Sequence, residues 1–230
     1  MNVDRIEDIN PNPEKGSVSL HDLLTHENPN AARYQGLIQR QMQAYGDTFL
    51  PHRFSERWTG DASPFEEEGV RNFFAEKLQG GLLIDPGCSD SDAMRYTARL
   101  FKAKTYIGID LGKKLDPYVG YPPTDPRLRF MPSTNNPPCV ELKVKADMLD
   151  FISHLPDNSA NFSVNGIDDS IILVAEYDEA FWNEIKRATR LGGIIFGYES
   201  RLSHFDAKGL QSKEKELGLR WPYFIYEKVV

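Results

Sequence analysis

The segment LLIDPGCSDSD, from Leu82 to Asp92, holds side chains that could bind a small charged ligand. A buried strand is expected up to Asp85 and a helix after the turn, so the free amides of a helix start would face a ligand there. The turn does not match the dinucleotide-binding pattern GxGxxG, because Ser89 and Asp92 stand at the two glycine positions after Gly87. Its acidic residues would repel a pyrophosphate but not a cation. The turn therefore favours a cationic ligand.

Strands and helices alternate on both sides of this turn, which indicates βαβ units and a mostly parallel sheet covered on both faces. Hydrophobic periodicity and Gly/Pro punctuation predict strands at 81–85, 105–110, 140–147, 161–166, 194–198 and 223–229, and helices at 29–45, 63–80, 90–102, 177–190 and 207–217. We therefore predict an α/β fold, with a doubly wound sheet and an N-terminal helical extension.

The turn resembles the first motif of the class I S-adenosylmethionine-dependent methyltransferases, an acidic residue followed by alternating glycines after a buried strand. Asp85 and Gly87 match this motif, while Ser89 and Ser91 replace later glycines. The resemblance implies a Rossmann-like fold, S-adenosyl-L-methionine as cofactor and methyl transfer as the reaction. It extends over roughly residues 66–200.

Later positions match in order. Asp110 ends the second strand of the resemblance, where the family's acidic residue takes the ribose hydroxyls, and its carboxylate can accept two hydrogen bonds. Asp147 and Met148 stand where the family flanks adenine. The cofactor-binding set implied in this way is Asp85, Gly87, Cys88, Ser89, Asp110, Leu111, Asp147, Met148 and Asn165.

Structural alternatives exist for these residues. Asp85 or Asp147 could cap a helix, Asp110 could be solvated, and Gly87 could supply only a positive φ. Cys88 is expected to be a small packed residue rather than a nucleophile.

The helix before the last parallel strand matches the family through Arg187 and the Leu191-Gly192-Gly193 turn. These residues are expected to be structural rather than catalytic. After that strand the family usually has a hairpin of two strands, of which only one is recognisable.

Catalysis is less defined by the sequence, because in-line methyl transfer depends mainly on positioning and needs a base only if the acceptor must lose a proton. The paired aspartates Asp168 and Asp169 follow the fourth strand of the resemblance and could act as a base, bind a divalent cation, or simply be solvated. Other candidate bases are His52, His154, His204 and Tyr177.

Two regions lie outside the matched core, residues 29–58 and the proline-rich stretch 112–138. We expect both to fold over the carboxyl ends of the strands and wall an acceptor pocket. The alternatives are that the helix of the first region packs on a sheet face or on an oligomer partner, and that the proline-rich stretch is a surface loop. The predicted division is an N-terminal extension at 1–62, with a loose polar tail over about the first 28 residues, and a methyltransferase-like domain at 63–230.

Composition limits the partners. The formal net charge is -7 and there is no dense run of Lys or Arg, so nucleic acid is expected to be an improbable partner and a small molecule the acceptor. The two cysteines, Cys88 and Cys139, give neither a disulfide framework nor a metal cluster. With no apolar run long enough for a bilayer and no signal-like start, a cytoplasmic protein is predicted.

Two other functions remain open, and a third is set aside. A methyltransferase-like binding protein without activity is favoured by Ser89 and Ser91. A different reaction of S-adenosylmethionine on the same fold is also compatible, because fold does not fix function. A dinucleotide oxidoreductase would need the GxGxxG turn that is missing here.

Overall fold

The computed structural model describes residues 6–8, 23–45, 57–59, 63–88, 93–111, 139–165, 167, 172–198, 205–220 and 222–230. The strands are β1 Ile6–Asp8, β2 Leu82–Pro86, β3 Thr105–Asp110, β4 Val140–Lys145, β5 Asn161–Ser163, β6 Ile194–Tyr198, β7 Leu210–Ser212 and β8 Tyr223–Lys228. The helices are α2 Ala31–Tyr45, α3 Glu68–Leu78, α4 Ala93–Leu100, α5 Met148–Ser153 and α6 Ala175–Ala188, with a 3₁₀ turn η2 at Pro64–Glu66. Among the described residues, no helix has both the length and the apolar character needed to cross a bilayer.

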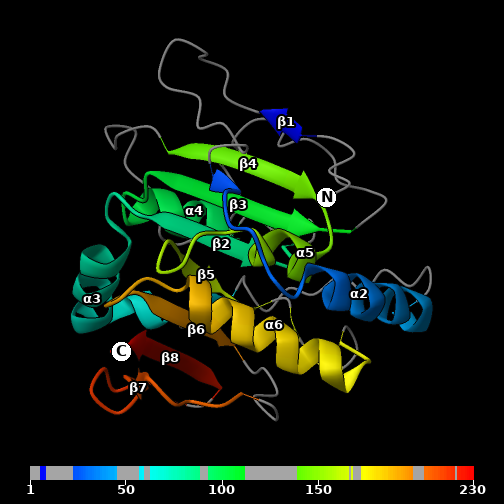
Figure 1. Cartoon of the computed structure of the whole chain (residues 1–230). Helices are drawn as coiled ribbons and strands as arrows, with labels where there is room; N and C mark the ends of the chain where they lie inside the picture. Colours follow the sequence, from blue (N-terminus) through cyan, green and yellow to red (C-terminus); the bar gives the residue numbers. More distant parts are fainter. Residues whose placement is uncertain are drawn as a thin grey trace.

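The eight strands form one sheet in the order β1-β4-β3-β2-β5-β6-β8-β7. The five from β4 to β6 are parallel (Figure 1). The chain proceeds from β2 to β3 and β4 on one side and then returns to β5 and β6 on the other, so the strand order reverses between β2 and β5. Such a reversal opens a crevice at the carboxyl ends of the strands. The predicted fold class, α/β with a doubly wound and mostly parallel sheet, is confirmed.

Helices α2, α5 and α6 cover the face of the sheet that is in front in Figure 1. Arg187 of α6 fixes the end of α5, because its guanidinium donates to the carbonyl oxygens of Ile152, Ser153 and Leu155 at 3.1, 3.4 and 2.8 Å. The last carbonyls of a helix have no partner within the helix and need such donors. Arg187 therefore has a structural role, as the sequence favoured.

The opposite face is covered by α3 and α4 around an aromatic core that includes Trp58 and Phe196. Here the predicted helix over 63–80 is divided. Ser63 caps the short η2, its Oγ accepting the amide of Phe65 at 3.1 Å, and α3 begins separately at Glu68.

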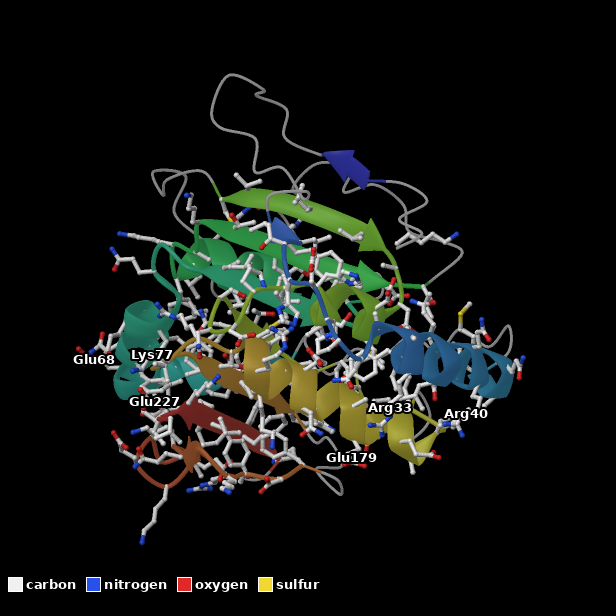
Figure 2. The ribbon with its side chains drawn as sticks, in the orientation of Figure 1. Arg33, Arg40, Glu68, Lys77, Glu179 and Glu227 are labelled. Atoms are coloured by element: carbon white, nitrogen blue, oxygen red, sulfur yellow. The ribbon has the colours of Figure 1, made fainter. Side chains whose placement is uncertain are left out.

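The C-terminal part corrects a prediction, since residues 207–217 do not form a helix. β7 pairs antiparallel with β8, which pairs antiparallel with β6. Gly209 and Gly218 have φ of +82° and +66°, outside the helical region. Lys77 of α3 reaches Glu227 of β8 at 2.5 Å and anchors the pair (Figure 2). β7 is thus the second hairpin strand that was not recognised in the sequence.

The N-terminal extension is joined to the domain at several points. β1 pairs antiparallel with β4, so the predicted loose tail is wrong for residues 6–8. α2 packs along α5 and α6 and ends near the start of α6, where Gln41 accepts two backbone amides. Trp58 lies on the other face of the sheet. The residues that join them, 46–56, lie outside the described residues, as do 112–138, so the pocket-wall expectation stays a prediction.

Candidate functional site

Asp85 lies at the carboxyl end of β2, beside the reversal of strand order. Its side chain is 2% exposed, and its Oδ2 accepts the hydroxyl of Tyr106 at 2.9 Å. Oδ1 has no hydrogen-bond partner among the described residues. Burial raises the pKa of Asp85 to about 7, while hydrogen bonds from Tyr106 and Ser163 act in the opposite direction. A buried oxygen without a partner is costly, so Oδ1 is suited to a donor supplied by a ligand.

The turn after β2 bends toward β3. Gly87 has a φ of +69°, and the amides of Gly87 and Cys88 donate to the carbonyl of Ile109 at 2.8 and 3.2 Å. Cys88 is packed so closely on β3 that a Cβ at Gly108 would lie 2.8 Å from its Sγ. Burial raises the pKa of the Cys88 thiol, which fits a packed residue rather than a nucleophile. Ser89 lies outside the described residues.

Asp110 and Leu111 end β3 next to this turn. Asp110 is half-buried and lies in register with Lys145 of β4, and its carbonyl accepts the amide of Ala146 at 3.2 Å. Leu111 is 36% exposed. The Asp110 carboxylate is therefore held at the carboxyl edge of the sheet, one strand away from Asp85.

Asp147 is the N-cap of α5. Its Oδ1 accepts the amides of Leu149 and Asp150 at 2.9 and 3.1 Å, and the hydroxyl of Tyr177 lies 3.0 Å from both carboxylate oxygens. Burial raises the pKa of Asp147 to about 6 against these hydrogen bonds. The capping alternative is thus realised, and contact of adenine with Asp147 and the half-buried Met148 stays a prediction.

The candidate bases divide into two groups. Asp168, Asp169, His52 and His204 lie outside the described residues. Tyr177 is fully buried, burial raises the pKa of its hydroxyl well above the ordinary value, and that hydroxyl is donated to Asp147. His154 stands at the far end of α5 from Asp147, with Nδ1 on a backbone carbonyl of the same helix at 2.8 Å. The Tyr177 hydroxyl is thus engaged by Asp147 and His154 lies at the opposite end of α5, and a role of either residue as a base stays a prediction.

No group of three or more His, Cys, Asp or Glu that could hold a metal ion occurs within the ranges the structure describes. The possible cation pair at Asp168 and Asp169 falls in the gap after residue 167.

Two residues that the sequence analysis did not select, Tyr106 and Ser163, lie beside Asp85. Trp58, which it considered only as part of the region 29–58, reaches Ser163 through Asn165. The indole Nε1 of Trp58 donates to Oδ1 of Asn165 at 2.9 Å. Nδ2 of Asn165 donates to Oγ of Ser163 at 2.7 Å, and Ser163 lies on β5 beside Asp85 of the neighbouring strand β2, close enough to lower the pKa of Asp85. The alternation of polar residues at 161, 163 and 165 in a buried strand could have indicated part of this network from the sequence. Nothing in the sequence around Trp58 indicates that its indole belongs to the network.

No protein-family model and no curated protein sequence matches this chain. Solved structures with a similar chain path include a proposed RNA methyltransferase from Pyrococcus horikoshii, with 12% identity, 86% of this chain and 100% of that chain covered, and a TM-score of 0.43. A proposed methyltransferase from Escherichia coli has 12% identity, coverages of 79% and 92%, and a TM-score of 0.46. A proposed methyltransferase from Streptococcus mutans, solved in complex with SAH, has 12% identity, coverages of 71% and 95%, and a TM-score of 0.40.

One expectation about partners is corrected. Nucleic acid was set aside as an improbable partner, but the matching structures include a proposed RNA methyltransferase, a proposed rRNA methylase from Clostridium thermocellum and an rRNA methylase from Streptococcus thermophilus. A net charge summed over the whole chain does not describe the field at one surface. The acidic composition therefore does not exclude nucleic acid, and the preference for a small-molecule acceptor is withdrawn.

Proposed function

We propose that this protein binds S-adenosylmethionine at the carboxyl ends of β2, β3 and β4 and transfers its methyl group to an acceptor. One observation carries the proposal: Asp85, Asp110 and Asp147 lie at the carboxyl ends of three neighbouring parallel strands, along one edge of the sheet. Neighbouring strands are ~4.8 Å apart, so the three strand ends span roughly 10 Å, the scale of a nucleoside.

The side chains at this edge suit the cofactor's chemistry. Asp85 has a buried oxygen without a partner among the described residues, and a ligand with a charged ammonium group would supply the missing donor. The carboxylate of Asp110 can accept from two ribose hydroxyls. Gly87, with its positive φ, brings the backbone of the turn close to the same edge.

Asp147 has less capacity for a ligand, because three donors already share its carboxylate. Recognition of adenine at this end would therefore depend on the remaining lone pair of Oδ2 and on packing against the Met148 side chain.

When bound, S-adenosylmethionine supplies a methyl group on a positively charged sulfur. The contribution of the chain is to hold the donor in line with the acceptor and to exclude water, which can account for most of the acceleration. If the acceptor must lose a proton, Asp168 and Asp169, which follow β5 in the sequence, remain the candidate bases.

Calorimetric titration with S-adenosylhomocysteine tests the binding step. We expect a dissociation constant in the micromolar range, which corresponds to a standard binding free energy of about -8 kcal/mol. Absence of heat and of a thermal shift at millimolar ligand would refute the proposal.

Transfer is tested separately with methyl-labelled S-adenosylmethionine and a cell extract divided into RNA, protein and small-molecule fractions. Label should enter one fraction with the parent protein, and it should enter more slowly with Asp110→Ala at cofactor concentrations below the weakened dissociation constant. Binding without label in any fraction would instead identify a binding protein of methyltransferase fold.

A further inference from the structure

The buried polar side chains beneath the strand reversal form one directed series of hydrogen bonds. Trp58 donates to Asn165 and Asn165 donates to Ser163, which lies on β5 beside Asp85 of the neighbouring strand β2. We propose that Trp58 is a positioning residue of the cofactor site, which acts through Asn165 and Ser163 to hold Asp85 ready for a cationic ligand. This inference rests on the proposed function.

The geometry of the series indicates that Trp58 influences Asp85 through hydrogen bonds and not through apolar packing alone. Trp58, Ser163 and Asn165 are each at most 1% exposed, so water does not compete for their polar atoms. Hydrogen bonds in such surroundings are stronger and polarise one another. Because the amide of Asn165 receives at one end and donates at the other, removing the indole donor leaves its orientation less defined.

The aromatic contacts of Trp58 account for the burial of its ring but not for the use of its N–H. The ring lies 5.4 Å from those of Phe65 and Phe74 and 5.1 Å from that of Phe196. Trp182, on the other face of the sheet, has similar ring contacts and is 1% exposed, yet its Nε1 has no partner among the described residues. Trp182 is therefore a matched control for Trp58, because it is equally buried but its indole N–H has no hydrogen-bond partner among the described residues.

Asp85 is the group on which the series should act. Four titratable neighbours face Asp85: Tyr106 and Asp110 from β3, Lys143 from β4, and Cys88 from the turn after β2. Hydrogen bonds from Ser163 and Tyr106 lower the pKa of Asp85, and so does Lys143, whereas Asp110 raises it. Displacing Ser163 from Asp85 should therefore raise the pKa of Asp85 and reduce its ionised fraction near neutral pH.

The experiment compares Trp58→Phe with Trp182→Phe, two variants that remove the same atoms from buried positions. Affinity for S-adenosylhomocysteine is measured by calorimetry between pH 5.5 and 8.5, a range about the pKa of Asp85. Trp58→Phe should bind about three- to tenfold more weakly at pH 7, with the midpoint of the pH dependence moved upward by about half a unit. Trp182→Phe should retain the parent affinity and midpoint.

Ser163→Ala provides a second test that leaves the aromatic core unchanged, in case Trp58→Phe does not fold. It should move affinity and midpoint in the same direction, and the double variant should lose less than the two single losses combined. Affinity and midpoint equal to those of Trp182→Phe would overturn the role of Trp58, as would an unchanged Ser163→Ala. If the parent protein does not bind the ligand, the proposed function fails and this inference fails with it.

Discussion

The hydroxyl of Tyr177 lies 3.0 Å from each carboxylate oxygen of Asp147, so the first turn of α6 is joined to the cap of α5. Asp147 and Tyr177 are both buried. The pair had been considered separately in the sequence, Asp147 as an adenine contact and Tyr177 as a candidate base. Their contact indicates that Tyr177 stabilises the carboxylate that begins α5.

Tyr177→Phe should therefore lower stability without abolishing methyl transfer. The loss of one buried hydrogen bond costs about 1 kcal/mol in urea unfolding. The hydroxyl bonds to the carboxylate and lowers the pKa of Asp147, so its removal raises that pKa above about 6. The stability deficit should then be larger at pH 7.5 than at pH 4.5.

Tyr226→Phe is the control, because Tyr226 is half-buried in β8 and should lose little stability. If Tyr177→Phe were as stable as the parent but inactive, Tyr177 would be catalytic after all.

Asp85→Asn should make stability less sensitive to pH. Burial raises the folded-state pKa of Asp85 to about 7 from an ordinary value of 3.8, so the folded chain binds more protons than the unfolded chain between these values. Stability of the parent then falls as pH rises through this window, by at most about 1.4 kcal/mol per pH unit from this residue.

The free energy of unfolding of Asp85→Asn, relative to the parent, should therefore increase from pH 5 to pH 8 in urea titrations. Asp206→Asn is the control, since Asp206 is exposed and its pKa is lowered, chiefly by the backbone amide of Lys208. A constant difference between Asp85→Asn and the parent would mean that Asp85 is ionised throughout.

Asp110→Ala should weaken cofactor binding while the fold persists. A carboxylate that accepts from two ribose hydroxyls contributes roughly 1.5–3 kcal/mol, so S-adenosylhomocysteine should bind at least about tenfold more weakly in calorimetry. Because Asp110 is the last residue of β3, the thermal midpoint should change little. Equal affinity in Asp110→Ala and in a distant control, Asp206→Ala, would exclude the ribose role.

Much of the fold followed from local patterns. The strand at 105–110 and the helix near 177–190 were predicted because apolar spacing and the glycine turn at 192–193 are encoded nearby in the chain. β7 and β1 were missed because a three-residue strand is defined by its partner: β7 depends on β8 and β1 on β4.

The sequence could predict those residues of the candidate site that lie at the ends of predicted strands. Asp85 and Asp110 are at the carboxyl edge because β2 and β3 end there. The partners of Asp85 could not be predicted in the same way. Trp58 and Asn165 are 107 positions apart, and only tertiary packing selects this donor for this acceptor. Burial, which determines the pKa of Asp85, is likewise a property of the assembled layers.

The last prediction concerns α2, whose side chain Gln41 acts as the cap of another helix. Oε1 of Gln41 accepts the amides of Leu173 and Val174 at 3.0 and 3.1 Å, and α6 has no side-chain cap of its own at Val174. Unpaired amides at a helix start are costly, and removing a cap typically loses about 1 kcal/mol.

Gln41→Ala should therefore lose about 1–2 kcal/mol in urea unfolding, and hydrogen exchange should accelerate at the amides of Leu173 and Val174. Gln43→Ala, an exposed position on the same helix with the same change of side chain, should leave both measurements close to the parent values. Arg40, labelled in Figure 2, forms an exposed ion pair with Glu176 at 3.3 Å, which should contribute little by comparison. Equal exchange rates in the two glutamine variants would mean that α6 begins without help from Gln41 of α2.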